Sequence, residues 1–252
     1  MVASQELKVD VLTLFPGMFE GYFNESIMKR AAEKGILNLA IHNLRDWAVD
    51  PHRTVDDTPY GGGAGMVMMV STIYDAVGSL RREESHVVLL SPQGKLLTQR
   101  LAKELAKKRH LIIICGHYEG VDERVRELLV DEEISVGDYV ISNGSLTAML
   151  LIDVVTRLLP GVVGDERSIV EDSFYNGFLD YPHYTKPRVF RGMEVPKVLV
   201  SGDHGKIRRW RRREALRKTL QRRPELLRKA RLSDEDKELI REIQARNIRE
   251  KD

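Results

Sequence analysis

The sequence predicts an α/β protein with a mainly parallel sheet, followed by a smaller, mainly helical C-terminal domain. Through the first 160 residues, short apolar runs alternate with segments of helical spacing, an order typical of parallel strands joined by crossover helices. Residues 161–185 are rich in Gly, Asp and Ser and weak in periodicity, which predicts a linker. Residues 186–252 then contain two long helical patterns, the first dense in arginine. We therefore expect domains over residues 1–160 and 186–252, joined by a linker over residues 161–185.

The elements of the first domain alternate between strand and helix. An apolar strand over residues 8–15 is ended by Pro16 and Gly17, and helical spacing over residues 18–34 stops at Gly35. Each later strand is a short apolar run, and each later helix has apolar residues three or four apart. These later elements are strands over residues 36–41, 87–90, 111–115 and 139–141, and helices over residues 72–80 (with Ser71 as N-cap), 96–108, 122–130 and 145–159.

The C-terminal domain is expected to be mainly helical. Residues 198–200 form a short apolar run that predicts a strand. A basic helix is expected over residues 204–222, where a proline follows closely. Ser233 and Asp236 have the spacing of a capping box, which predicts the start of a last helix that runs through Arg249.

Composition excludes several classes of protein. No run of 18 apolar residues is present, and the longest apolar cluster, residues 148–159, is interrupted by Asp153 and Arg157, so we expect no membrane span. Residues 1–8 lack the basic and apolar segments of a secretory signal. Cys115 is the only cysteine, which excludes an internal disulfide and suits a reducing compartment. The sequence therefore predicts a cytoplasmic protein.

Motifs of several common ligand sites are absent from the sequence. There is no phosphate-binding loop of the form G-x-x-x-x-G-K-[ST]. Residues 61–65 (GGGAG) fail the dinucleotide fingerprint, because a methionine stands where its last glycine would be. The seven histidines are scattered and no H-E-x-x-H is present, so the residues predict no metal site.

Positive charge is concentrated in one segment of the chain. The formal net charge is +2, but residues 206–231 carry 13 Lys or Arg against two acids, a net of +11, which leaves about −9 on the rest. This asymmetry predicts nucleic acid as the partner, since clusters of this kind neutralise phosphate backbones. The candidate contacts are Arg208, Arg209, Arg211 and Arg212. Two alternatives stay open: an acidic membrane surface, or a helix paired with the acidic residues after Ser233.

Three segments rich in Gly and Ser are expected to follow strands directly. They are residues 91–94, 116–120 and 142–145. Ligands of an open α/β sheet bind at the carboxyl ends of its strands, so the three segments together predict a small-molecule site. Each segment alone would equally well be a turn or a helix cap.

A long loop and two ionisable residues each have two interpretations. Residues 53–65 combine two acids, an aromatic residue and four glycines, which suits either a flap over a ligand or a flexible connection. Arg157, near the end of an apolar helix, would reach a charged partner or extend to solvent. Asp172 suits a turn or an N-cap as well as catalysis.

Several long motifs resemble one known family. They include DVLTLFPGMFEGYF, HRTVDDTPYGGGAGMVM, IIICGHYEGVDERV, SVGDYVISNGSLTAMLLIDVVTRLLPGVVG, LDYPHYTKP and VLVSGDHGKIRRWRRREALRKT. Over nearly the whole chain, they are similar to the bacterial tRNA (guanine-N1)-methyltransferases, the TrmD family of the SPOUT superfamily. The resemblance implies an α/β fold with a deep trefoil knot, a homodimer whose active site is shared between subunits, and a tRNA substrate.

The resemblance also implies a methyl donor and the residues around it. The donor is S-adenosylmethionine, held in a bent form, and Mg²⁺ is a further aid in the family, although no ligand cluster in this sequence predicts a metal. Carried over by position, the cofactor pocket consists of Leu90, Ser91, Pro92, Gly116, Tyr118, Glu119, Val136, Gly137, Asp138, Tyr139, Val140, Ile141 and Gly144.

The implied reaction is methylation of N1 of guanosine 37 in tRNAs that carry another guanosine before it. N1 becomes a nucleophile only when its proton is removed, and Asp172 matches the family's general base. Arg157 matches the residue that stabilises negative charge developing on O6. Asp56 and Gly65 match residues that contact the target and its neighbour.

Two positions depart from the family's usual pattern. Asn143-Gly144-Ser145 stands where Gly-Gly-Glu is usual, and we expect Asn143 to keep the turn because asparagine tolerates a left-handed backbone. His117 stands where arginine is usual. Two alternatives remain: a SPOUT enzyme that methylates another RNA position, such as a ribose 2′-OH, or an RNA-binding protein that has lost catalysis through these departures.

Overall fold

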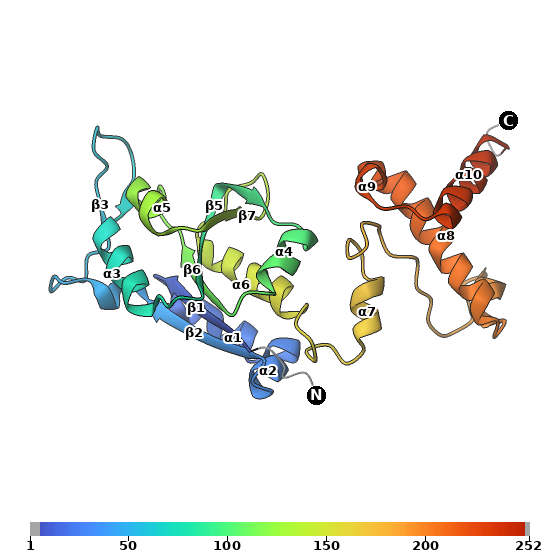
Figure 1. Cartoon of the computed structure of the whole chain (residues 1–252), viewed down its shortest axis with the longest axis horizontal. Coiled ribbons are helices and arrows are strands. Elements are labelled where there is room, and N and C mark those ends of the chain that lie inside the picture. Colours follow the sequence, from blue (N-terminus) through green and yellow to red (C-terminus); the bar gives the residue numbers. More distant parts are fainter. Residues whose placement is uncertain (1–5, 250–252) are drawn as a thin grey trace. The chain divides into compact units, whose positions relative to one another are not determined.

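A parallel sheet lies at the centre of the first of two units into which the chain divides, residues 1–166 and 167–252 (Figure 1). The computed structural model describes residues 6–249, with the backbone alone at residues 166, 167 and 246–249. In spatial order, the strands of this sheet are β2 (Leu37–Asn43), β1 (Leu7–Thr13), β6 (His110–Cys115), β5 (Ser85–Leu96) and β7 (Glu132–Ser135). The predicted α/β class with a parallel sheet is confirmed.

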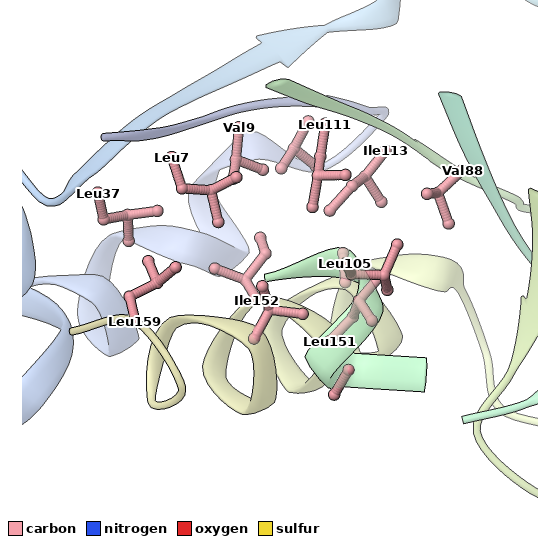
Figure 2. Close-up of a cluster of buried hydrophobic side chains, with 14 of the residues drawn as sticks. Leu7, Val9, Leu37, Val88, Leu105, Leu111, Ile113, Leu151, Ile152 and Leu159 are labelled. Atoms are coloured by element: carbon pink, nitrogen blue, oxygen red, sulfur yellow. The ribbon is translucent and has the colours of Figure 1, made fainter. Parts of the chain in front are cut away.

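Helices cover both faces of the sheet. They are α2 (Ser26–Glu33), α4 (Gln99–Leu105) and α6 (Gly144–Thr156) on one face, and α3 (Val70–Leu80) and α5 (Glu123–Leu129) on the other. Alternate residues of a buried strand point to opposite faces, so Leu111 and Ile113 of β6 pack toward α4 and α6 (Figure 2). Ile112 and Ile114 pack toward α3 and α5. The first unit is therefore a three-layer α/β/α structure with every residue of β6 buried.

The predicted helix over residues 18–34 is broken. A 3₁₀ turn, η1 (Pro16–Phe19), and a short helix, α1 (Glu20–Phe23), precede α2. The Asn24 side chain donates to a carbonyl one turn earlier (2.5 Å), and Ser26 has a left-handed backbone (φ 52°) that a continuous helix does not allow. The apolar residues keep their helical spacing across residues 18–34, but Asn24 and Ser26 interrupt the helix itself.

The prediction of a strand over residues 139–141 is wrong, and β7 takes its place in the sheet. The sequence did not predict β7, because Glu132 and Glu133 make this strand polar. In the structure, Lys95 donates to Glu132 (3.1 Å) and Arg126 donates to Glu133 (3.0 Å). Residues 139–141 are exposed, Val140 to 87%. Their apolar character therefore belongs to a surface and not to the core.

The predicted helical character of the C-terminal region is confirmed. Its elements are α7 (Glu166–Glu171), a hairpin of β8 (Val189–Phe190) and β9 (Met193–Glu194), η3 (Lys197–Val200), α8 (His204–Arg222), α9 (Pro224–Lys229) and α10 (Asp234–Arg249). A small core is formed by Phe178, Leu216, Leu239 and Ile243. The predicted capping box is also confirmed: the Ser233 N–H donates to the Asp236 carboxylate (2.8 Å), and the Asp236 N–H donates to the Ser233 hydroxyl (3.1 Å).

Two further details of the prediction are wrong. Residues 198–200 lie in η3, a 3₁₀ turn that follows Pro196, whose φ is fixed by its ring. Helix α3 has Met69, and not Ser71, at its N-cap. Between residues 6 and 249, no helix is both long and apolar enough to span a membrane. Residues 1–5, part of the segment that was expected to lack a secretory signal, lie outside this range.

One carboxylate is buried within the sheet. Asp10 of β1 is 1% exposed and accepts hydrogen bonds from Lys8 Nζ (3.0 Å), His42 Nε2 (2.7 Å) and His110 Nε2 (2.7 Å). Burial alone would raise the pKa of Asp10, but the hydrogen bonds from His42, Lys8 and His110, with the charge of Lys8, hold this pKa below its usual range. The carboxylate is thus ionised and fully partnered inside the core.

Candidate functional site

A pocket of about 310 Å³ opens beside a bulge in β5 and the carboxyl end of β6. The segments 91–94, 116–120 and 142–145, which the sequence assigned to one site, lie around this pocket. Residues 91–94 bulge out of β5, which pairs with β7 on both sides of them. Residues 142–145 follow no strand, contrary to expectation, and form the start of α6. Of the thirteen residues predicted to bind the cofactor, all but Asp138 line the pocket.

Two glycines let the walls of the pocket approach each other closely. The Gly144 N–H donates to the Gly116 carbonyl at 2.8 Å, and a Cβ at Gly144 would lie 2.8 Å from the Gly116 nitrogen. A Cβ at Gly94 would lie 2.4 Å from the backbone nitrogen of Ile134 in β7. Only glycine fits at such distances. At these two points, backbone segments around the pocket therefore pack directly against each other, with no side chain between them.

A polar network supports the wall formed by residues 91–94. The Ser91 hydroxyl and the Arg126 Nε both donate to one carboxylate oxygen of Glu133, at 2.5 and 3.0 Å. Burial opposes the charge of Arg126, but its bonds to Glu133 and Glu123 raise the pKa of the guanidinium. Arg126 lines the pocket and presents a fixed cation to a ligand. Sequence reasoning missed this pair, because it depends on β7.

His117 joins two walls of the pocket. Its Nδ1 donates to the Ser142 carbonyl (3.1 Å), and its ring contacts the rings of Phe15 and Tyr118, with centroids 5.0 and 4.2 Å away. Tyr118 has a left-handed backbone (φ 56°), which is rare for an aromatic residue and typical of functional sites. The imidazole therefore has a structural role where the resembling family has arginine.

The left-handed turn expected at Asn143 is absent. Asn143 is extended (φ −164°, ψ 165°) and caps α6, because its side-chain oxygen accepts from the Ser145 N–H at 2.9 Å. Ser145 is 1% exposed, and its hydroxyl lies 2.9 Å from the hydroxyl of Thr13 in β1. Both residues that depart from the family's pattern therefore have hydrogen-bond partners, Asn143 within its own turn and Ser145 on β1.

The long loop after β2 is anchored beside the pocket. Within it, β3 (Asp56–Asp57) pairs with β4 (Val67–Met68), which the sequence did not predict. Backbone hydrogen bonds of 3.0 Å tie residues 66 and 68 to the wall segment 116–120. Asp56 faces Met68 across the hairpin. The structure therefore brings Asp56 and Gly65, the predicted contacts to the target and its neighbour, close to this wall.

A second cavity, of about 580 Å³, lies within the second unit. It is bounded by residues 170–181 and by α8, and we call it the Asp172 cavity. Asp172 lines it together with Arg208, Arg211 and Arg212. The Asp172 N–H donates to the Ser168 carbonyl (3.1 Å), which holds the residue at the end of α7. The predicted general base and three of the four predicted nucleic-acid contacts therefore share one cavity.

Arg157 lies in the first unit, as the C-cap of α6. Its side chain is exposed. Leu146 and Leu150 precede it at helical spacing and are 49% and 43% exposed. Helix α6 thus carries an apolar stripe that leads to Arg157.

The arginines of α8 differ in their partners. Arg212 makes two hydrogen bonds to the buried Asp236 (2.6 and 2.8 Å), and Arg209 reaches two glutamates of α10 (2.8 and 3.4 Å). For Arg209 and Arg212, the alternative that the basic helix pairs with the acidic residues after Ser233 is therefore confirmed. Arg211 lies 3.9 Å from Glu171. Arg208 is exposed and makes no ion pair within the described part of the chain.

Known proteins that this chain resembles share one description. A family model described as tRNA (Guanine-1)-methyltransferase TrmD matches residues 7–229. The tRNA (guanine-N(1)-)-methyltransferase of Dictyoglomus turgidum is 56% identical over 237 residues, which are 94% of this chain and 96% of the relative. The enzyme of the same name from Desulforamulus reducens is 54% identical over 242 residues, 94% of this chain and 95% of the relative. That from Dehalococcoides mccartyi is 55% identical over 242 residues, 95% and 98% of the two chains.

Proposed function

Because this chain belongs to the tRNA (guanine-1)-methyltransferase family, we propose that it transfers a methyl group from S-adenosylmethionine to N1 of guanosine 37 in tRNA. The substrates we propose are tRNAs of the cytoplasm in which another guanosine precedes the target. The observation that carries the proposal is the Asp172 cavity, where a carboxylate lies among the arginines of α8. A carboxylate can accept the N1 proton, and the arginines can bind the phosphates that flank the base.

The pocket of the first unit fits the proposed methyl donor. It is lined by residues 116–120, 136–137 and 139–141, and main-chain groups of such loops suit the hydrogen-bonding edges of adenine and ribose. Tyr139 and Ile141 add apolar surface, and Arg126 offers a cation for a carboxylate group. S-adenosylmethionine, when bound, supplies a methyl group whose bond to sulfur breaks with both electrons leaving on the sulfur.

The chemistry assigned to this chain is proton removal and charge stabilisation. In the proposed step, Asp172 accepts the proton of guanine N1, so that the N1 electron pair can form the new bond to carbon. Negative charge that develops on O6 is stabilised by Arg157. Arg208 and Arg211 bind tRNA phosphates, which orients the base without reading its identity. The proton on Asp172 is then lost to solvent.

No metal-binding cluster is found among the described residues. None of them form a group of three or more His, Cys, Asp or Glu side chains that could hold an ion. We therefore assign Mg²⁺ no step in the proposed reaction.

The proposal includes the trefoil knot of the resembling family, formed by the segments around the pocket. Two observations support it. The backbone at residue 144 lies directly against that at residue 116, and the backbone at residue 94 lies directly against β7. Segments this close are expected where one part of the chain passes through a loop of another, a rare arrangement.

We also propose that the protein forms a homodimer in which both copies contribute residues to the active site. The support is the exposed stripe of α6, where Leu146 and Leu150 precede Arg157. Leu146 and Leu150 lie one helical turn apart, and adjoining exposed apolar side chains can form part of a protein interface. Nearby, the Tyr22 hydroxyl donates to Asp153 of α6 (2.5 Å). A second copy on this stripe would bring Arg157 to the interface.

Methylation of a defined tRNA tests the proposed function. With S-adenosylmethionine, a transcript with guanosine at positions 36 and 37 is expected to gain one 1-methylguanosine at position 37, measured by mass spectrometry of the digested RNA. A transcript that differs only by adenosine at position 37 is expected to gain none. Equal methylation of both transcripts, or a methyl group on a ribose, contradicts the proposal.

Arg208→Ala is expected to weaken tRNA binding through a lost phosphate contact. The slope of log affinity against log salt concentration should fall by about 1, as measured by filter binding at several salt concentrations. Arg222→Ala, on an exposed part of the same helix outside the Asp172 cavity, is the matched control and should change the affinity less. Arg212→Ala should instead lower the free energy of unfolding by about 1–3 kcal/mol, because the buried Asp236 carboxylate would lose both hydrogen bonds from the guanidinium and keep only the one from the Ser233 N–H.

A further inference from the structure

The second unit contains another cavity, of about 640 Å³, which the proposed reaction does not use. One side is the segment 181–188, and the other is formed by η3 and α8. Its lining includes three rings and three cations, and we call it the aromatic cavity. These residues are Tyr181, His183, Tyr184, Lys186, Arg188 and Arg211.

The rings of the aromatic cavity are held in place by neighbours. The Tyr181 hydroxyl donates to Glu171 (2.7 Å), and its ring is tilted against that of His183, with centroids 4.6 Å apart. Tyr184 is backed by Trp210 of α8, at a centroid distance of 6.4 Å, and remains 50% exposed. A partly exposed, supported ring is the platform on which single-stranded nucleic acid stacks its bases.

The cations of this cavity suit phosphate. Lys186 and Arg188 lie on the same segment as the rings, and alternation of aromatic and basic residues is typical of single-strand binding. The Arg211 guanidinium lies over the Tyr181 ring, 4.9 Å from its centroid. The Nε of Arg211 is buried and has no hydrogen-bond partner among the described residues. The Arg211 side chain as a whole is 44% exposed, so it is accessible to a phosphate.

The aromatic cavity adjoins the Asp172 cavity. Tyr181, Ile207 and Arg211 line both, so the two cavities share one wall. Consecutive nucleotides of an unstacked strand are joined by one phosphate. A base in each cavity would place that phosphate at the shared wall, where Arg211 is the cation.

We propose that the aromatic cavity binds the base of a nucleotide directly adjacent to the methylated guanosine, with Arg211 on the phosphate between them. The inference rests on the proposed function, since it takes the Asp172 cavity as the place of the target base. Stacking tolerates any base, because every base has a π-face. Stacking in this cavity therefore contributes affinity and fixes the path of the strand, and any preference for guanosine beside the target comes from other contacts.

A double-mutant cycle tests the proposal. The proteins are the wild type and Tyr184→Ala, and the RNAs are a tRNA transcript and two variants with an abasic nucleotide at position 36 or 38. Tyr184→Ala should raise the Kd for the intact transcript about 10-fold, as loss of one stacked base does. One abasic variant should cost the wild type a similar factor and cost Tyr184→Ala nothing. If both abasic variants weaken the two proteins by equal factors, no base stacks on Tyr184 and the proposal fails.

Two control variants separate stacking from folding. Tyr184→Phe keeps the ring and should recover most of the lost affinity. Phe190→Ala removes an exposed ring of β8 that does not line the cavity, and its Kd should stay within about 2-fold of the wild type. Thermal unfolding of each variant identifies a loss of structure. A Kd for Tyr184→Phe as high as that for Tyr184→Ala contradicts a stacking role.

The binding measurement distinguishes this proposal from the proposed reaction. The double-mutant cycle can show coupling between Tyr184 and the base at position 36 or 38 while the wild type adds no methyl group to guanosine 37. That result would overturn the proposed reaction and leave the assignment of the aromatic cavity standing. Methylation of guanosine 37 without coupling at either position would overturn the cavity assignment alone. A wild type that does not bind tRNA would overturn both.

Discussion

Asp172→Asn is expected to slow methyl transfer to guanosine 37 by about 10²- to 10⁴-fold. The amide keeps the shape of the side chain but cannot accept the N1 proton. Asp172 lies in the cavity with Arg208, Arg211 and Arg212, and the substitution leaves these cations in place. The Kd for tRNA should therefore change little, and the loss should appear in the rate of a single turnover at saturating tRNA.

Asp180→Asn is the matched control, because Asp180 is a second carboxylate that lines the same cavity. Its carboxylate accepts hydrogen bonds from His183 and from the Tyr181 N–H, each at 2.7 Å, and the proposed reaction gives it no proton transfer. Its effect on the single-turnover rate should be much smaller than that of Asp172→Asn. Full activity of Asp172→Asn would show that N1 is not deprotonated by this residue and would favour chemistry at another RNA position.

Asp10→Ala is expected to lower the free energy of unfolding by about 3–5 kcal/mol. The substitution removes the carboxylate that Lys8, His42 and His110 share inside the sheet and leaves these three partly or fully buried side chains without their common acceptor. Urea unfolding can be followed through Trp47, whose ring lies 5.9 Å from that of His42. Asp46→Ala is the control: Asp46 is 58% exposed and pairs with Arg53 at 3.4 Å, so its loss should cost less than about 1 kcal/mol.

The contribution of Asp10 should also depend on pH. Its pKa is lower in the folded protein than in the unfolded chain, where it is about 3.9. The stabilisation is therefore complete above that unfolded value and is lost as the pH falls through the folded pKa. The difference in unfolding free energy between the wild type and Asp10→Asn should be constant near neutral pH and shrink below about pH 4. A difference that grows on acidification would contradict the assignment.

Strands with uninterrupted apolar sequence could be predicted, and strands stabilised by charge could not. Residues 111–115 are apolar throughout, so β6 was evident in the sequence. In β7, Glu132 and Glu133 have the character of surface residues, and their partners Lys95 and Arg126 explain why they are tolerated in the sheet. Lys95 is 37 residues from Glu132, and Arg126, although only seven residues from Glu133, belongs to helix α5, so the fold brings these groups together.

The candidate sites show the same division. Loops rich in Gly and Ser predicted a pocket, because such loops at strand ends are a local pattern of the sequence. The Asp172 cavity depends on tertiary packing of residues 170–181 against α8, which no local pattern contains. Charge counting overestimated the surface available to RNA, because Arg209 and Arg212 are occupied by acids of α10.

The close contacts at Gly94 and Gly144 limit how the pocket of the first unit can change. A side chain at either position would meet the main chain of the opposite wall, which cannot rotate away as another side chain would. An inhibitor that takes its hydrogen bonds from these main-chain walls would therefore be hard to escape by mutation. A substitution that excluded the inhibitor there would also disrupt the site on which the cell's own enzyme depends, so resistance would have to arise elsewhere.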